Sequence, residues 1–402
     1  MKTLDSGCTI EAARDEFVSY IPRIRDRETV ALADAYMRIA AGDVYCENDI
    51  PSFDRSAMDG YAVRSEDIKD ASENAPVTLS VAGILYAGDH KEIICTPGSA
   101  VRVMTGAYIP AGYDCVVMQE DTDRGSSRVK IYKAVGRYVN YSFAGEQLKH
   151  GEAVVKRGDR LDRVALFRLA SAGCDSVEVV RRACVTIVTT GSELVSPGQP
   201  LPPGKIYDAV SALLSASVRE AGFLAETVHA ADTEQEIKDA LRAGGKSDLI
   251  ITTGGVSVGE KDLLPKLMEE LGAVKVFARA DIQPGTPTAG YILDGVPVLC
   301  LSGNPFAAVA NFDWYFPSIA CALTGCAAYI KKIFTARLDD DYDKWNRHRR
   351  MVRAFCENGS VRLPARTHFA SSLEGMAECN CYIMLPAGAK VSRGDMVEVL
   401  ML

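Results

Sequence analysis

Residues 249–262, LIITTGGVSVGEKD, combine an apolar run, a glycine pair and the start of a helical pattern. The run Leu249–Ile251 is short and continuously apolar, which is typical of a strand buried on both faces. The two glycines let the backbone turn sharply and approach a ligand closely. A strand, such a turn and a helix start together present N–H groups that can hold a phosphate. An ordinary connection with Asp262 as helix N-cap explains the same residues, whereas the acidic pair Glu260 and Asp262 favours a magnesium-phosphate site.

Strand-like and helix-like segments alternate from residue 181 to residue 328. This alternation predicts a doubly wound α/β domain, whose ligands bind at the carboxyl ends of the strands. Strands are expected at Val185–Val188, Glu226–His229, Leu249–Thr252, Val274–Ala278 and Val296–Leu301, and helices at Ser211–Glu220, Thr233–Ala243, Leu263–Leu271 and Phe306–Leu323.

Three of these strands end in turns rich in glycine and hydroxyl side chains. Asn304 has the side chain of a helix N-cap, and Pro305 suits the first helical position. Because parallel strands bring their carboxyl ends to one edge, we expect the three turns to form a common binding site. The turns are Thr190-Gly191-Ser192-Glu193, Thr253-Gly254-Gly255 and Ser302-Gly303-Asn304-Pro305.

The flanking regions differ from the α/β domain in their pattern of strand-like and helix-like segments. Residues 49–140 carry short strand-like runs split by glycine and proline, which predicts a β-rich domain in which Asp59 reads as a solvated turn residue. Residues 329–402 alternate again, with Asn358-Gly359 as a hairpin signal, and predict a small β domain. Helices are expected at Ile10–Tyr20, Thr29–Ala41 and Arg163–Ala172, so residues 1–48 and 141–180 read as a helical or connecting domain.

Composition excludes several classes of function. The net charge is −8 and no long basic run occurs, so nucleic acid is not expected as a partner. No apolar run approaches the ~20 residues of a membrane span, and residues 1–17 lack the apolar core of a signal peptide, so we expect a cytoplasmic protein. The 12 cysteines are scattered without metal-ligand spacing, which favours reduced, structural thiols.

The chain resembles the molybdopterin molybdenumtransferases, the MoeA family that includes the E domain of gephyrin. The likeness covers nearly the whole chain, and its most specific blocks are SAMDGYA at residues 56–62 and TGGVSVG at residues 253–259. Further matching motifs are Thr105-Gly106-Ala107, Thr189-Thr190-Gly191-Ser192-Glu193-Leu194, Asp262, Pro284-Gly285 and Gly303-Asn304-Pro305.

The resemblance implies an L-shaped, four-domain protomer of mixed α/β class that forms a homodimer. Its parts would be an adenylyltransferase-like α/β domain, a β-rich insert domain, a connecting domain and a C-terminal small β-barrel. The implied reaction inserts molybdate into the dithiolene of adenylylated molybdopterin and releases AMP. Molybdopterin adenylyltransferase and recipient molybdoenzymes would be the partners.

The resemblance also implies the site residues. Carboxylates from separate segments can hold the Mg²⁺ that a pyrophosphate requires. The implied metal ligands are Asp59, Glu193, Asp208 and Asp262, of which Asp59, Asp208 and Asp262 would also be catalytic. The implied cofactor-binding residues are Thr105, Gly191, Ser192, Glu193, Thr253, Gly254, Gly255, Ser257, Pro284, Gly285, Asn304, Pro305, Arg353 and Ser371.

One departure from the family pattern bears on the molybdate side of the site. Family members carry two lysines around the Pro-Gly pair, where this chain has Gln283 and Thr286. Polar uncharged side chains replace two ammonium groups poorly as anion ligands. A non-catalytic paralogue that binds pterin or nucleotide as a carrier or scaffold is therefore the alternative function, and the choice between molybdenum and tungsten stays open.

Overall fold

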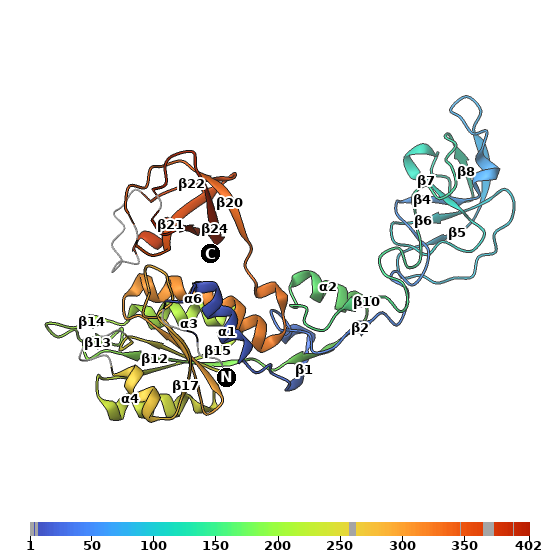
Figure 1. Ribbon diagram of the computed structural model, residues 1–402. Coiled ribbons are helices and arrows are strands. Elements are labelled where there is room, and N and C mark those ends of the chain that lie inside the picture. Colours follow the sequence, from blue (N-terminus) through green and yellow to red (C-terminus); the bar gives the residue numbers. More distant parts are fainter. Residues whose placement is uncertain (1–3, 5–6, 257–262, 346, 365–373, 389) are drawn as a thin grey trace. The chain divides into compact units, whose positions relative to one another are not determined.

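The computed structural model describes the chain except for residues 1–3, 5–6, 257–262, 346, 365–373 and 389 (Figure 1). The chain forms two compact units, which are described separately. The first unit comprises residues 1–42, 157–162 and 177–402, and the second comprises residues 43–156 and 163–176. The domain boundaries expected from the sequence stay a prediction.

The first unit is built on a six-stranded sheet of order β15-β12-β16-β19-β18-β17. The strands β15, β12, β16 and β19 are parallel, and β18 runs antiparallel to both of its neighbours. Their bounds are β12 Cys184–Thr190, β15 Leu224–Ala230, β16 Leu249–Thr253, β17 Val274–Ala278, β18 Ala289–Leu293 and β19 Val296–Leu301. A short parallel pair, β13 Leu194–Val195 and β14 Ile206–Tyr207, follows β12.

Helices cover both faces of this sheet, as the alternation predicts (Figure 1). On β16, Ile251 packs in the core that α1, α3 and α6 share, whereas Ile250 packs in the core beneath α4 and α5. Both isoleucines have 0% exposure, so the strand is buried on both faces. The helices are α1 Ile10–Ser19, α3 Ala209–Glu220, α4 Glu234–Ala243, α5 Leu264–Glu270 and α6 Pro305–Thr324. The doubly wound architecture is confirmed.

The C-terminal part of the first unit is a closed barrel of order β20-β22-β21-β23-β24. Asn358 and Gly359 take positive φ values of 50° and 77°, as the two central residues of a tight hairpin require. The strands are β20 Ile333–Leu338, β21 Arg350–Glu357, β22 Ser360–Arg362, β23 Cys381–Leu385 and β24 Met396–Met401. The small C-terminal barrel is confirmed.

The helix expected at Thr29–Ala41 is wrong. These residues form strand β1 (Arg27–Ala31), which pairs with β11 (Ser176–Val180), and then a single 3₁₀ turn. Arg38 is 6% exposed, pairs with Glu28 and donates a hydrogen bond to the carbonyl of Val180 at 3.0 Å. Strand pairing and this buried guanidinium outweigh the small helix preference of an alanine-rich segment.

The second unit contains a five-stranded sheet of order β7-β4-β6-β5-β8. The sequence missed β4 (Gly60–Val63), which lies between β6 and β7 with every residue buried. Turn-forming residues precede this strand, so the sequence pattern around it indicates a turn. The other strands are β5 Val77–Leu85, β6 Ser99–Val103, β7 Cys115–Met118 and β8 Arg128–Ile131; smaller elements are β2 Val44–Tyr45 with β10 Ala153–Val155, β3 Arg55–Ser56 with β9 Tyr141–Ser142, and α2 Arg163–Ser171. The β-rich character of this unit is confirmed.

The cysteines and the helices bear on two expectations drawn from composition. All 12 cysteines are free, and burial raises the pKa of Cys300 and Cys381 to about 12, which leaves these thiols protonated and unreactive. Within the described ranges, no helix combines the length and the apolarity that crossing a bilayer demands.

Candidate functional site

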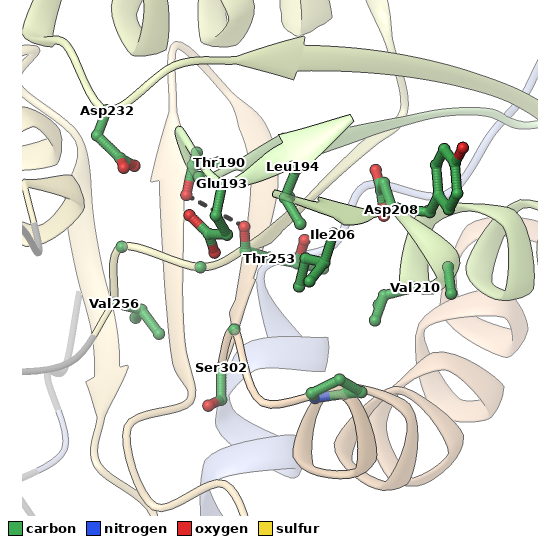
Figure 2. A pocket seen from close by; sticks show the side chains of 17 residues that line it. Thr190, Glu193, Leu194, Ile206, Asp208, Val210, Asp232, Thr253, Val256 and Ser302 are labelled. Atoms are coloured by element: carbon green, nitrogen blue, oxygen red, sulfur yellow. Dashed lines mark hydrogen bonds between the residues drawn. The ribbon is translucent and has the colours of Figure 1, made fainter. Parts of the chain in front are cut away.

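The carboxyl ends of β12, β16 and β19 border a cavity of about 400 Å³ (Figure 2). Because these strands are adjacent and parallel, their three following turns meet at one edge of the sheet. Of the residues expected at a site, the cavity brings together Gly191, Glu193, Asp208, Thr253, Gly254, Gly255 and Pro305. Ser192 and Asn304 lie directly beside these lining residues in the chain.

Close backbone packing shapes the floor of the cavity. Gly254 has a φ of +91°, and a Cβ placed there would lie 2.6 Å from the carbonyl oxygen of Thr190. A Cβ on Gly303 would in turn lie 3.2 Å from the Cα of Gly254. Thr190 also donates a hydrogen bond from Oγ1 to the carbonyl of Thr253 at 3.2 Å, which joins the first two turns (Figure 2). A side chain at position 254 would disrupt this spacing, and the glycine leaves the backbone accessible to a ligand.

Two helices begin at the cavity. Asn304 caps α6 by accepting a hydrogen bond from the Ala307 amide at 3.1 Å, and Pro305 is the first helical residue, as predicted. Asp208 caps α3 by accepting from the Ser211 amide at 3.0 Å. The partial positive charge of both helix N-termini therefore faces the cavity, where it attracts anions.

Three carboxylates line the same cavity (Figure 2). Asp208 is 7% exposed, and the Glu193 carboxylate lies over Gly191, where a Cβ would approach both of its oxygens to 2.9 Å. Asp232 accepts a hydrogen bond from the Ser192 amide at 2.9 Å. Among the lining residues that the structure describes, none is lysine, arginine or histidine.

Asp232 was missed by the sequence interpretation. It follows β15, the fourth parallel strand of the sheet, so its carboxylate reaches the same edge as the three predicted turns. The pattern of a strand followed by Ala231-Asp232 was present in the sequence, but it contains no glycine to draw attention to it.

The predicted residues Asp59 and Thr105 belong to the second unit. The Thr105 amide and hydroxyl both donate to one carboxylate oxygen of Asp59, at 2.7 and 2.8 Å. Both bonds lower the pKa of Asp59, and the bond from the amide has the larger effect. Asp59 is thus held as a carboxylate in a fixed orientation, which fits both a turn residue and a metal ligand.

The remaining predicted residues lie around α6 or outside the described residues. Pro284 and Gly285 belong to a loop after β17 that contacts α6. Arg353 is 1% exposed, stands 4.3 Å above the ring of Phe306, and has its pKa lowered by burial. Ser257, Asp262 and Ser371 lie outside the described residues.

Mg²⁺ binds oxygen ligands, and the cavity offers carboxylate oxygens of that type from Glu193, Asp208 and Asp232. Within the described part of the chain, no three histidine, cysteine or acidic side chains stand close enough together to hold a metal ion. Because Mg²⁺ usually keeps several waters and binds one or two carboxylates plus phosphate oxygens, this donor set suits a cation that arrives with a phosphate ligand.

Three family models match consecutive parts of the chain. They describe the MoeA N-terminal region (domain I and II) at residues 8–173, a probable molybdopterin binding domain at residues 186–320, and the MoeA C-terminal region (domain IV) at residues 335–402. The cavity and its three turns lie in the second of these regions.

Curated relatives and solved structures agree with the models. A molybdopterin molybdenumtransferase from Bacillus subtilis is 34% identical over 398 residues, covering 96% of this chain and 92% of its own. One from Staphylococcus epidermidis is 33% identical and covers 92% and 90%. A crystal structure of the molybdopterin biosynthesis MoeA protein from Pyrococcus horikoshii superimposes with a TM-score of 0.83 at 28% identity, covering 99% and 100%. The chain therefore belongs to the MoeA family of molybdopterin molybdenumtransferases.

Proposed function

We propose that this protein is a molybdopterin molybdenumtransferase of molybdenum cofactor biosynthesis. It inserts molybdate into the dithiolene of adenylylated molybdopterin, cleaves the pyrophosphate link and releases AMP. The observation that carries this proposal is the cavity at the carboxyl edge, which lies in the region matched by the molybdopterin-binding model and joins glycine-rich turns to two helix N-termini. Identity to molybdenumtransferases over 90% or more of their length favours this function over a non-catalytic carrier or scaffold.

The lining residues divide the work of binding between backbone and carboxylates. The N-termini of α3 and α6 attract the phosphate groups, and the hydroxyls of Thr253 and Ser302 supply hydrogen bonds around them. The tight approach of Gly254 to Thr190 fixes these groups before the ligand arrives, so they lose little freedom on binding.

Three carboxylates beside a pyrophosphate repel it unless a cation intervenes, because like charges within a few ångströms disfavour each other. We therefore infer a requirement for Mg²⁺, held by Glu193 and Asp208. When bound, the ion neutralises charge on the phosphate oxygens and polarises the bond that breaks. The parts assigned by resemblance to Asp59 and Asp262 stay proposals of the same kind.

Assembly, partners and location are also proposals. We infer a homodimer, since symmetric dimers are the commonest solution for a chain with uncovered apolar side chains such as Val164 and Phe167, which are 55% and 65% exposed. Sedimentation should give more than the 43.4 kDa of one chain, and a monomer at all concentrations would refute this. Molybdopterin adenylyltransferase and recipient molybdoenzymes are the proposed partners, and the cytoplasm is the proposed location.

The proposed reaction is tested by supplying purified protein with adenylylated molybdopterin, Mg²⁺ and molybdate. We expect AMP to be released and the product to activate a molybdoenzyme that lacks its cofactor. The control omits molybdate. Binding of adenylylated molybdopterin without AMP release, with molybdate present, would instead identify a carrier.

A further inference from the structure

The buried side chain of Asn311 stands where two loops of the carboxyl edge approach each other. Asn311 lies on α6 with 0% exposure, between the turn that begins this helix and the loop at Gln283–Thr286. Its Nδ2 donates one hydrogen bond to the carbonyl of Pro284 at 3.0 Å and another to the carbonyl of Ala307 at 2.8 Å. Both acceptors are carbonyls, which fixes the orientation of the amide.

The other half of this amide has no hydrogen bond. Within the described residues, Oδ1 of Asn311 is buried and finds no donor. A buried acceptor without a partner lowers stability, so a residue chosen for packing alone would be apolar here. The position of the loop, not the stability of the helix, gives the reason for an asparagine.

The loop is shaped around this amide. Gly285 has a φ of +100°, and a Cβ placed there would overlap the Asn311 side chain. On its other side the loop is tied to the start of β21. The backbone amide of Gln283 donates to the carbonyl of Arg349, and the backbone carbonyl of Gln283 accepts from the amide of Met351, both at 2.8 Å. Asn311 thus joins the loop to α6 by a hydrogen bond and by close packing.

A chain of hydrogen bonds links this contact to the cavity. The Ala307 carbonyl accepts from Asn311, and the Ala307 amide donates to the capping side chain of Asn304. We propose that Asn311 is a positioning residue that couples the Pro284–Gly285 loop to the turn Gly303–Pro305, and that this coupling serves binding of the oxyanion substrate.

Charge indicates which substrate depends on the loop, and this step rests on the proposed function. The cavity is lined by carboxylates, which disfavour a free oxyanion, whereas the cation Arg353 stands over Phe306 in the first turn of α6. Molybdate is therefore the substrate whose site Asn311 positions. The side chains at positions 283 and 286 are uncharged, so the loop contributes through its backbone and needs a fixed place.

Two substitutions separate positioning from packing. Threonine can donate to the carbonyl four residues earlier in a helix, so Asn311→Thr keeps the bond to Ala307 and loses the bond to Pro284. Asn311→Leu keeps the branched shape and the number of side-chain heavy atoms, and it loses both bonds. Thr324→Val is the matched control, since Thr324 is also buried on α6 and donates to a carbonyl four residues earlier at 2.7 Å.

The experiment measures KM for each substrate together with hydrogen exchange at residues 283–288. We expect Asn311→Thr, which keeps the bond to Ala307, to raise KM for molybdate about fivefold or more and to change KM for adenylylated molybdopterin less than about twofold. Both Asn311 variants should speed exchange of the Thr288 amide, which bonds Gly285 at 2.9 Å. Thr324→Val should show neither effect.

The outcomes that overturn the inference are specific. Equal rises in both KM values for Asn311→Thr, or unchanged exchange in residues 283–288, would assign Asn311 a purely structural role. If the natural protein releases no AMP at all, the proposed function fails, and the exchange data alone then decide whether Asn311 positions the loop.

Discussion

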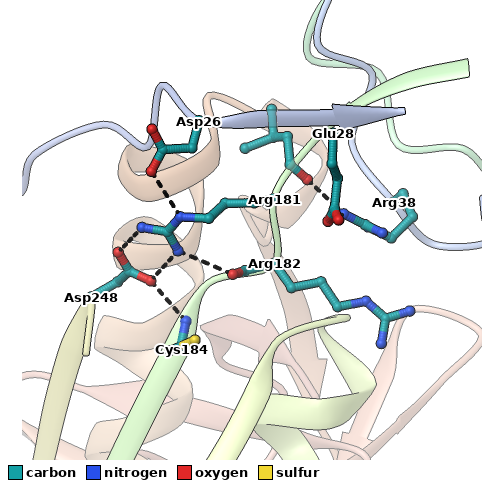
Figure 3. Close-up of polar contacts among 8 residues, drawn as sticks. Asp26, Glu28, Arg38, Arg181, Arg182, Cys184 and Asp248 are labelled. Carbon is teal, nitrogen blue, oxygen red and sulfur yellow. Dashed lines mark hydrogen bonds and ion pairs between the residues drawn. The ribbon is translucent and has the colours of Figure 1, made fainter. Parts of the chain in front are cut away.

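The two edges of the central sheet handle charge in opposite ways. At the amino edge, the Arg181 guanidinium donates to both oxygens of Asp248 at 2.7 Å and to Asp26 at 3.0 Å (Figure 3). Asp248 also accepts from the amide of Cys184 at the start of β12, at 2.8 Å. These contacts raise the pKa of Arg181, and the hydrogen bonds to Asp248 have the largest effect. The charged groups therefore hold each other in place.

At the carboxyl edge, Glu193, Asp208 and Asp232 line a cavity whose described lining contains no basic side chain. The same sheet thus compensates charge within the chain at one end and leaves it for a ligand at the other. We therefore propose that the amino edge stabilises the fold, whereas the carboxyl edge carries the function. Substitutions at the two edges should therefore change different measured quantities.

The largest effect is expected from Gly254→Ala at the carboxyl edge. The new Cβ would meet the Thr190 carbonyl at 2.6 Å and strain a backbone at φ +91°, which displaces two turns of the site. We expect AMP release to fall about a hundredfold or more, since displacements near 1 Å have that effect on catalysis. Gly245→Ala is the control, because a Cβ there meets no atom within 4 Å. Similar rates for both variants would contradict the assignment.

A smaller effect, a gain in the affinity for molybdate, is expected when positive charge is added near the same edge. Gln283→Lys with Thr286→Lys should tighten molybdate binding, because each charge-assisted hydrogen bond adds ~1.5–3 kcal/mol before the lysines are ordered. The net expectation is ~1–2 kcal/mol, roughly five- to thirtyfold in affinity. Calorimetric titration at fixed ionic strength measures it. An unchanged affinity would show that groups elsewhere bind molybdate, and not the two positions where family members carry lysine.

At the amino edge, Arg181→Ala should change stability and not catalysis. Removing the guanidinium leaves Asp248, whose side chain is 14% exposed, without its cation. Because Arg181 itself is 35% exposed, solvent screening reduces the loss, and we expect about 1–3 kcal/mol in the free energy of unfolding. Denaturant unfolding measures this loss, and AMP release should stay within about twofold. A large loss of activity in a folded variant would mean that the two edges are coupled.

The smallest effect is expected in the second unit, from Thr105→Val. The amide of residue 105 still donates to Asp59, but the hydroxyl is lost, so the pKa of Asp59 should rise part of the way towards its ordinary value. A carboxylate with a lowered pKa contributes stability above its unfolded pKa and loses it as the pH falls through the folded value. The variant should lose that contribution at a higher pH. NMR titration of Asp59 checks the direction, with Thr105→Ser as the control that keeps a hydroxyl.

The sequence predicted those parts of the fold whose signals are local. Val274–Ala278 and Val296–Leu301 were predicted with the bounds that the structure has, and the turn at Asn304-Pro305 was predicted down to its cap. Val298–Leu301 is an unbroken apolar run, Val274–Ala278 is apolar except for Lys275, and Asn304 is a specific capping residue. Local chemistry decides such elements before the rest of the chain does.

The missed elements depend on distant partners. The β4 strand is short and becomes a strand because β6 and β7 pair with both of its edges. The strand β18 contains Gly290, against which the rings of Phe17 and Phe277 pack, so its residues gain burial from segments far away in the sequence. The segment around Arg38 has a helical pattern but forms no α-helix, because the Arg38 side chain contacts the distant residues Glu28 and Val180. Asp232 joins the candidate site only because β15 lies beside β12 in the sheet.

We propose that the carboxylates of the carboxyl edge work through a divalent cation. The most direct measurement is the rate of AMP release against Mg²⁺ concentration, for the natural protein, for Glu193→Gln at the cavity and for Glu226→Gln on the exposed side of β15. We predict no release with a chelator present, a natural response for Glu226→Gln, and a need for about tenfold more Mg²⁺ in Glu193→Gln, equivalent to ~1.4 kcal/mol. Full activity in the chelator, or identical Mg²⁺ curves for the two variants, would show that no divalent cation acts through Glu193.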